Sequence, residues 1–436
     1  MFRSTFLNIK RFSYSYSSNS LLRNRVTNST KLLSIQNINI NNRNDSSIIG
    51  ETQLARNIFF SSYISNVTDY QITKEDEMFS EIEESKTYER RGNFVASRSI
   101  LGRSLEMTER MIGKKNPITL NILFRLINCE MAIGELSRAQ QLANTVLERV
   151  DLADSSNDRY TIPSLNNLIL CNKYQGNLQL AESNSDKLIT LARDRGNREL
   201  EIGTLLNKAI IQGLQCNDEC QKLFEEAMIL SNKYLEPTHP LNEIIYGNYG
   251  SYCHSVEKDE MAESLYKKAI ESAQSNNNQK ELSNILTNYS EFLLDSEQLD
   301  RAEEMLKLAS AKAEEVYGRQ SAKLGSVIYI MAKLYRAKGN AQWAEGFFNR
   351  CITIFEDHKN LSTMAQKEQA QKERQETPQY QAGKREIELR TNKEVDIDYG
   401  NVLWDFAQML REKGRVPEAV NLEQRARKLN ALEDDE

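Results

Sequence analysis

The chain has 436 residues, of which 39% are hydrophobic, and its formal net charge is −6. This length suits several domains or one extended array, and only six prolines are available to interrupt helices. No apolar run approaches the roughly 20 residues that a membrane-spanning helix needs. The acidic balance disfavours nucleic acid as a partner, because phosphate binding requires a basic stripe.

Residues 1–44 differ from the rest because they carry seven basic residues and no Asp or Glu, the first acid being Asp45. They are rich in serine, and Phe2, Phe6 and Ile9 can form an apolar stripe beside the bases. This composition is typical of a mitochondrial transit peptide, which predicts a protein of the matrix or of the inner-membrane surface. A low-complexity tail rich in Asn and Ser is the alternative. Without these seven bases, 49 basic residues remain against 62 acidic ones, a net charge of −13.

After a polar linker at 45–74, a pattern of helix, tight turn and second helix recurs with a period near 42. A small residue early in each second helix marks the copies, at Ser97, Ala139, Ala181, Cys220, Ala262, Ala302, Ala344 and Ala419. Self-similarity at a fixed period indicates units that stack to bury their apolar faces. The sequence therefore predicts an all-α fold, an α-α superhelix of about eight helix pairs whose first helices line the concave surface.

The turn between the two helices of each repeat lies five residues before the small residue. The turn positions are Gly92, Gly134, Gly176, Gln215, Glu257, Glu297, Gly339 and Gly414. Glycine relieves the strain of leaving a helix. We therefore expect altered turns where Gln215, Glu257 and Glu297 replace it. Eight residues before the turn, a column of large apolar residues marks the first helices at Leu126, Leu168, Tyr249, Tyr289, Met331 and Phe406.

The last interval between small residues is 75, which leaves an insertion before the final repeat. We assign 75–357 to repeats one to seven, 358–396 to a charged insertion, 397–430 to the last repeat and 431–436 to an acidic tail. The run from Met364 to Lys384 is rich in Gln, Lys and Glu, without apolar periodicity. It is predicted to be a solvated or partly helical excursion, and a partner-docking arm is the alternative.

The repeat columns resemble the tetratricopeptide repeat (TPR) family, whose motif places Gly-x-Leu/Tyr-x-x-Ala across the turn, as at Gly134–Ala139 and Gly176–Ala181. The family's common unit has about 34 residues. A period near 42 is similar to kinesin light chains instead, which Thr238-His239-Pro240 also resembles. The resemblance implies a solenoid that binds protein segments. The clamp by which some members hold chaperone tails needs lysines, and these are missing beside Arg125, Asn128 and Asn167.

No motif for catalysis, phosphate binding or a cofactor stands out. The six cysteines, Cys129, Cys171, Cys216, Cys220, Cys253 and Cys351, include no C-x-x-C pair and largely occupy small-residue positions of the repeats. The three histidines lie in different repeats without ligand spacing. We therefore expect neither an enzyme nor a metal or other cofactor. A hydrolase or ligase assembled across distant repeats is the alternative from another class.

The candidate binding residues lie on the predicted inner face of the first helices. The column nine residues before the turn has asparagines whose amides suit a peptide backbone, and it reads Arg125, Asn167, Leu206, Asn248, Asn288, Ile330 and Asp405. The predicted peptide-binding residues are Asn121, Arg125, Asn128, Asn167, Asn248, Ser251, Asn284, Asn288 and Tyr329. Chance placement in an Asn-rich chain is the alternative. Trp343 and Trp404 are interpreted as packing residues.

Two functions remain open. The first is a mitochondrial scaffold whose groove holds an extended segment or a subunit of a complex. Mitochondrial members of the resembled family include an inner-membrane factor for respiratory complex III, which implies assembly or maintenance of that complex. The second is a cytosolic cargo or signalling adaptor like the kinesin light chains.

Overall fold

The structure is a computed structural model, in which residues 69–90, 93–372 and 392–430 are described. These residues form sixteen α-helices and one short 3-10 turn, η1 (Ser155–Asn157). The predicted transit peptide and most of the predicted linker therefore lie outside the described residues. Helix α4 begins at Asp69, six residues before the predicted start of the first repeat.

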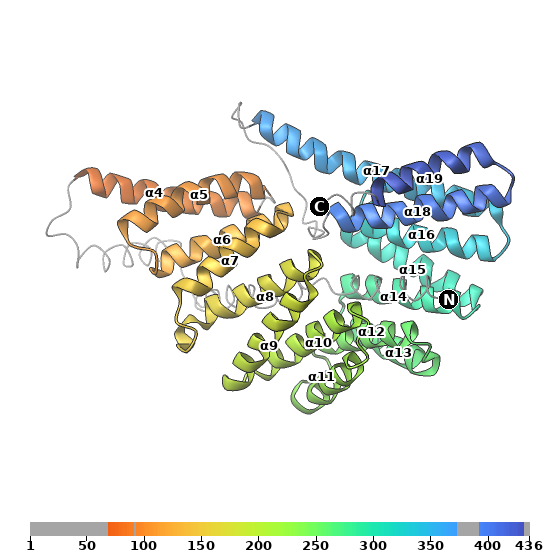
Figure 1. The fold of residues 1–436 in the computed structure, drawn as a ribbon, viewed down its shortest axis with the longest axis horizontal. Coiled ribbons are helices and arrows are strands. Elements are labelled where there is room, and N and C mark those ends of the chain that lie inside the picture. Colours follow the sequence, from red (N-terminus) through yellow and green to blue (C-terminus); the bar gives the residue numbers. More distant parts are fainter. Residues whose placement is uncertain (1–68, 91–92, 373–391, 431–436) are drawn as a thin grey trace, which may run out of the picture. The chain divides into compact units, whose positions relative to one another are not determined.

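The helices pair as the repeat pattern predicts (Figure 1). The first helices are α4 (Asp69–Arg90), α6 (Pro117–Ile133), α8 (Asp158–Tyr174), α10 (Arg198–Leu214), α12 (Pro240–Ser255), α14 (Gln279–Asp295), α16 (Ala322–Ala337) and α18 (Asn392–Glu412). The second helices are α5 (Phe94–Met111), α7 (Leu136–Arg149), α9 (Leu178–Asp194), α11 (Cys220–Tyr234), α13 (Asp259–Ser275), α15 (Leu299–Tyr317), α17 (Ala341–Lys372) and α19 (Val416–Asn430).

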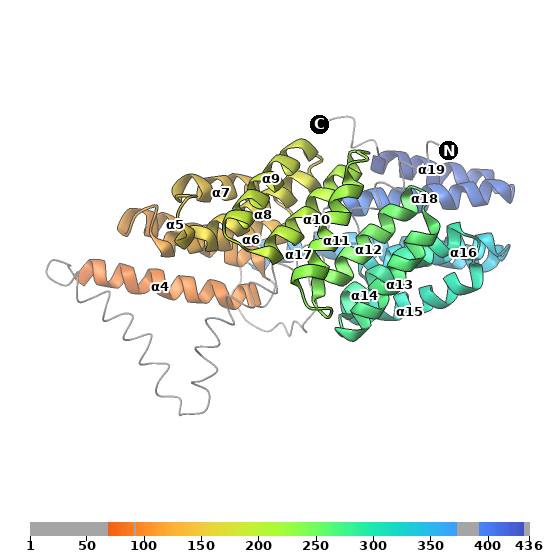
Figure 2. The ribbon, with the colours of Figure 1, turned by 90° about the horizontal axis from the view of Figure 1, so that it is seen from below.

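The described chain forms two compact units, each with its own set of helix contacts. One unit contains residues 69–130 and 138–170, and the other contains 131–137 and 171–430. In the second unit the helix pairs follow one another in chain order from green to blue (Figures 1 and 2). There α10, α12, α14 and α16 each contact the next first helix, so that α10, α12, α14, α16 and α18 create a first-helix layer. This arrangement confirms the predicted all-α repeat architecture.

The predicted small-residue column is buried in every repeat. All eight members are at most 1% exposed: Ser97, Ala139, Ala181, Cys220, Ala262, Ala302, Ala344 and Ala419. Four residues later, the large side chains of Phe224, Tyr266, Leu306 and Phe348 are fully buried. Small residues allow close approach of the helix backbones, and the large ones fill the space one turn further along. The register read from the sequence is therefore confirmed.

Two of the three turns that lack glycine are not altered, contrary to our expectation. Glu257 and Glu297 both have φ of 59°, the left-handed conformation that Gly339 adopts with φ of 74°. At Glu297 the backbone bonds are those of a Schellman turn, since Gln298 N–H donates to the Leu293 carbonyl over 2.8 Å. The same turn is therefore made without glycine, at the cost of local strain.

The turn after α10 is shifted by one residue. Gln215 has φ of −84°, and the next residue, Cys216, takes the left-handed conformation with φ of 58°. The Asn217 N–H donates to the Gln212 carbonyl over 3.0 Å, which closes the Schellman turn one position later than in the other repeats. The prediction that Gln215 is the turn residue is wrong, because the helical hydrogen bonds continue through Gln215.

Helix α17 is longer than the other second helices described. It has 32 residues, whereas the others have 14 to 19. The first part of the predicted insertion, 358–372, therefore continues this helix. The next helix, α18, starts at Asn392, and residues 373–391 lie outside the described residues.

Candidate protein-binding surface

The nine predicted binding residues differ widely in exposure. Asn121 and Asn128 are exposed; Ser251, Asn288 and Tyr329 are partly exposed; and Arg125, Asn167, Asn248 and Asn284 are buried. The three partly exposed residues lie on α12, α14 and α16, which are consecutive members of the first-helix layer. The sequence pattern thus brings one accessible polar side chain onto each of three neighbouring helices.

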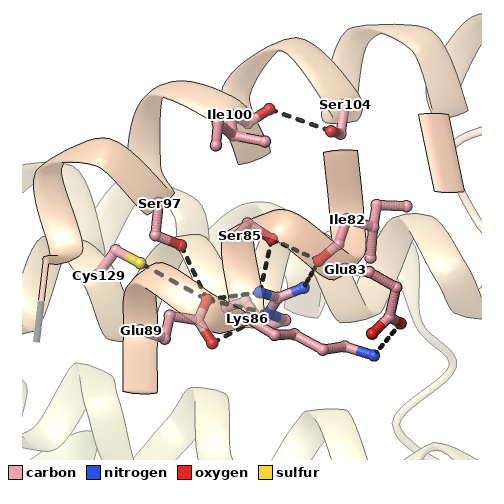
Figure 3. Close-up of polar contacts among 10 residues, drawn as sticks. Ile82, Glu83, Ser85, Lys86, Glu89, Ser97, Ile100, Ser104 and Cys129 are labelled. Carbon is pink, nitrogen blue, oxygen red and sulfur yellow. Dashed lines mark hydrogen bonds and ion pairs between the residues drawn. The ribbon is translucent and has the colours of Figure 1, made fainter. Parts of the chain in front are cut away.

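Arg125 has an internal partner on α4. Its Nε donates to both carboxylate oxygens of Glu89, over 3.0 and 3.3 Å, and its Nη2 donates to Ser85 Oγ over 2.7 Å. Its Nη1 donates to the Ile82 carbonyl, and the residue is only 8% exposed. These bonds belong to the polar cluster in Figure 3. A partner contact at Arg125 stays a prediction, but the guanidinium holds α4 against α6 in this structure.

Glu89 also contacts side chains of α5 and α6. Ser97 Oγ on α5 donates to Glu89 Oε1 over 3.0 Å, and Cys129 Sγ on α6 lies 3.9 Å from the same oxygen (Figure 3). Burial, with a further contribution from the Glu89 charge, raises the pKa of Cys129 to about 12. This thiol therefore stays protonated at neutral pH, in keeping with its predicted structural role. Of the six cysteines, Cys216 is exposed and the other five are buried.

The asparagines of the second unit are bonded in different ways. Asn248 is 0% exposed, and its Nδ2 donates to the Ile244 carbonyl one turn earlier over 2.8 Å. Asn284 Nδ2 donates to Glu281 Oε2 over 3.4 Å. Asn288 Nδ2 has no hydrogen-bond partner among the described residues. That Nδ2 atom is itself buried, but the Asn288 residue is partly exposed whereas Asn248 and Asn284 are buried, so Asn288 is the best placed of the three to turn an amide toward a ligand carbonyl.

Polar contacts join the last three members of the first-helix layer. The Tyr329 hydroxyl of α16 donates to Asp405 of α18, so the structure brings together two residues of the predicted inner columns. On the other side of α16, Lys333 Nζ pairs with Glu291 of α14 over 3.0 Å. The sequence analysis missed Lys333 and Glu291. Their opposite charges were visible, but their pairing depends on the register between helices.

A recurrent triad links each of two repeats to the repeat that follows. In the first, Tyr289 of α14 donates to Glu263 of α13, and Arg301 of α15 donates to both. The second triad has the same bonds among Glu356 of α17, Tyr399 of α18 and Arg425 of α19. The guanidinium carbons lie 5.9 and 6.0 Å from the tyrosine ring centres, a cation–π distance. Both triads therefore fasten one helix pair to the next.

Trp343 is not the packing residue that the sequence analysis expected. It is 59% exposed on α17 and lies 6.0 Å from the ring of Tyr335 and 6.1 Å from that of Phe347. Trp404 is 36% exposed. The reason is the register of α17, which turns Ala344 and Phe348 toward the core and leaves Trp343 outside.

The described residues hold neither a membrane-spanning helix nor a metal-binding cluster. No helix there is both long and apolar enough to cross a bilayer. Nor does that part of the chain gather three or more His, Cys, Asp or Glu side chains into a possible metal site.

Comparison with known families agrees with the helix pairing. A family model described as tetratricopeptide repeat matches residues 201–275 and 281–357, which span α10 to α17. These residues therefore consist of tetratricopeptide (TPR) repeats. None of the curated proteins matches the sequence.

Solved structures resemble this TPR protein at low sequence identity. The apo form of the quorum sensor NprR from B. thuringiensis is 12% identical, with a TM-score of 0.54 over 87% of this chain and 94% of that chain. The apo form of RapI is 11% identical, with a TM-score of 0.52 over 65% and 99%. BtubC (BKLC) from P. vanneervenii is 19% identical, with a TM-score of 0.43 over 58% and 96%. These likenesses concern the fold.

Proposed function

We propose that this TPR protein is a mitochondrial scaffold that binds an extended protein segment along its first-helix layer. The observation that carries the proposal is the placement of Ser251, Asn288 and Tyr329 on three consecutive first helices, each partly exposed. Hydroxyl and amide groups at regular intervals can hydrogen-bond to the backbone of a bound segment, largely independently of its sequence. TPR proteins as a class bind proteins and peptides in this manner.

Binding along the layer is tested by removing two of these polar groups. We expect Ser251→Ala combined with Asn288→Ala to weaken partner capture about thirtyfold, because each of the two hydrogen bonds contributes about 1 kcal/mol. Capture is measured by affinity purification from mitochondrial extract with quantitative mass spectrometry, beside thermal unfolding of the purified variant. Asn349→Ala, on the exposed face of α17, is the matched control. Unchanged capture by the double variant, or an equal loss in the control, would contradict the proposal.

The mitochondrial location is supported by the composition of residues 1–44, with seven basic residues and no acidic one. Such a segment suits import and later removal. The test is to express the full chain with a C-terminal tag, to determine the N-terminal residue of the mature protein and to locate it by fractionation. A mature protein that still begins at Met1 and stays in the cytosol would exclude import.

Assembly or maintenance of a respiratory-chain complex, complex III in particular, is the process that we propose for this scaffold. Support comes from the combination of a TPR array with a transit-like N-terminus. Proximity labelling of the tagged protein should then enrich complex III subunits. Enrichment of motor and vesicle proteins would instead favour the cytosolic adaptor of kinesin-light-chain type, which the period near 42 residues supports.

A further inference from the structure

Two buried carboxyl groups lie at the joint between α12 and α14. Glu243, in the first turn of α12, is 0% exposed, and Glu281, in the first turn of α14, is 4% exposed. Among the described residues neither carboxyl group has an ion-pair partner. Burial of an unpaired carboxylate costs free energy. The hydrogen bonds around these two residues therefore decide whether one or both of them can be ionised in the folded protein.

Glu243 holds the turn between α13 and α14. Its carboxylate accepts hydrogen bonds from Asn276 Nδ2, over 2.9 Å, and from Asn278 Nδ2. Asn278 is also the N-cap of α14, because its Oδ1 accepts from the Glu281 backbone N–H over 3.2 Å. Between them, Asn277 has φ of 51°, which a non-glycine residue adopts only under constraint. One carboxylate of α12 therefore fixes the start of α14.

Glu281 has weaker internal support. Its Oε2 accepts from Asn284 Nδ2 over 3.4 Å, and its Oε1 has no hydrogen-bond partner in the described part of the chain. The charged groups that face it are Glu243 from α12, Lys280 from its own helix and Lys323 from α16. Burial and the Glu243 charge outweigh the two lysines and raise the pKa of Glu281 to about 7. Burial also raises the pKa of Glu243, although the two amides oppose this effect.

We propose that Glu243 and Glu281 make a proton-dependent joint in which α14 is seated firmly on α12 only while the pair carries a single negative charge. With Glu281 protonated, Glu243 remains the carboxylate that holds Asn276 and Asn278. When Glu281 ionises, two buried like charges oppose each other, and the turn at 276–278 and the first turn of α14 loosen. The joint itself does not depend on the proposed binding function. Asn288 lies two turns further along α14, and an effect of the joint on partner capture through Asn288 rests on the proposed binding function.

The direction of the pH dependence follows from the raised pKa. In the unfolded chain Glu281 titrates near its ordinary value, whereas in the folded chain it retains its proton to about pH 7. The stability that protonated Glu281 contributes is therefore fully present below its pKa in the unfolded chain, and it is lost as the pH rises toward and through 7. The ordinary carboxylate in an ion pair shows the opposite dependence.

The test compares the full-length protein with Glu281→Gln, which keeps the neutral form at every pH. Hydrogen exchange is measured at about pH 5.5 and about pH 8 and expressed as protection factors, which remove the intrinsic pH dependence of the exchange rate. In the unsubstituted protein we expect protection of the amides at 281–285 to fall about tenfold or more between these pH values, and in Glu281→Gln to change by less than about twofold. Thermal unfolding at the same pH values should give the same ranking.

Glu291→Gln is the matched control, because Glu291 lies on the same helix but pairs with Lys333. It should lower stability at both pH values and leave the fall in protection at 281–285 intact. A second variant, Glu243→Gln, removes the repulsion and should move the transition of Glu281 to lower pH. If the unsubstituted protein and Glu281→Gln lost the same amount of protection, the proposal of a proton-dependent joint would be wrong. Partner capture is not measured here, so failure of the binding proposal would not affect the outcome.

Discussion

At the residue scale, the turns show how the repeat tolerates substitutions at its most constrained position. Glu257 and Glu297 occupy the left-handed conformation that glycine adopts at Gly339 and Gly414, with φ of 59° against 74° and 75°. A side chain with a Cβ is strained there. The surrounding helix pair enforces the conformation, because both flanking helices are fixed by their buried columns.

The strain at these turns predicts opposite effects of two exchanges. Glu297→Gly should stabilise the protein by about 0.5–1 kcal/mol, because relief of the strain at φ of 59° outweighs the added entropy of the unfolded chain and the side chain that is lost is exposed. Gly339→Ala, where φ is 74° and no atom lies near the new Cβ, should destabilise it by a similar amount through backbone strain alone. Urea denaturation of both variants checks this. A lower stability for Glu297→Gly would show that Glu297 makes a compensating contact.

At the element scale, α4 depends on polar contacts to an unusual degree. Among its described side chains, 79–90, Ile82 is the one buried apolar residue. Polar attachment of these residues includes Arg125 on α6, which pairs with Glu89, and Glu81, which accepts a hydrogen bond from Ser104 on α5. No described helix precedes α4, so among the described residues it has neighbouring helices on one side only. Loss of a single polar anchor therefore matters more for α4 than for an internal helix.

We expect Arg125→Met to loosen α4 while the second unit keeps its hydrogen-exchange protection. Removal of the guanidinium leaves the Glu89 carboxylate without its ion-pair partner, and the loss of stability should be about 2 kcal/mol. This is less than for a fully buried ion pair, because Glu89 keeps some contact with water. Hydrogen exchange over 79–90 is the measurement. Arg103→Met is the control, since its pair with Glu81 is largely exposed and is worth about 0.5 kcal/mol or less. Equal effects of the two variants would refute a special role for Arg125.

At the scale of the whole molecule, the second unit is joined by contacts between neighbouring repeats. The last repeat follows a long insertion, yet α18 packs against α16 and α17 as the other first helices pack against their predecessors. The rings of Phe348 and Phe406 stack with centres 5.1 Å apart, and Tyr329 bonds to Asp405 across the same boundary. In such an array, a perturbation should remain near the repeat in which it occurs.

Phe406→Ala tests this locality. The cavity should cost about 3–5 kcal/mol at the contact of α18 with α17, and protection against hydrogen exchange should fall in α18 and α19. Protection in α10 and α11, several repeats away, should be unchanged, because each repeat contacts only its neighbours. A uniform loss across the second unit would mean that it unfolds as a single cooperative block.

The sequence by itself determined the helix pairs and their register. The buried columns at Ala181, Ala262 and Phe348 follow from the helical spacing of apolar and small residues, which is a local property of the chain. For the same reason the helices begin and end close to the predicted turns, apart from the one-residue shift at Cys216. The helical spacing of apolar and polar positions determines which face of a helix is buried, whichever helix packs against that face.

Tertiary structure alone decided which polar groups meet. The sequence predicted Arg125 as a partner-binding residue, and the structure adds its internal bond to Glu89 of α4, 36 residues earlier. Tyr329 and Asp405 are 76 residues apart, and the acid pair of Glu243 and Glu281 exists only because α14 lies beside α12. A hydrogen bond depends on distances of a few tenths of an ångström and on direction, and the apolar pattern does not encode such detail. Hydrophobic burial is non-directional, so the apolar pattern of the sequence is enough to encode it.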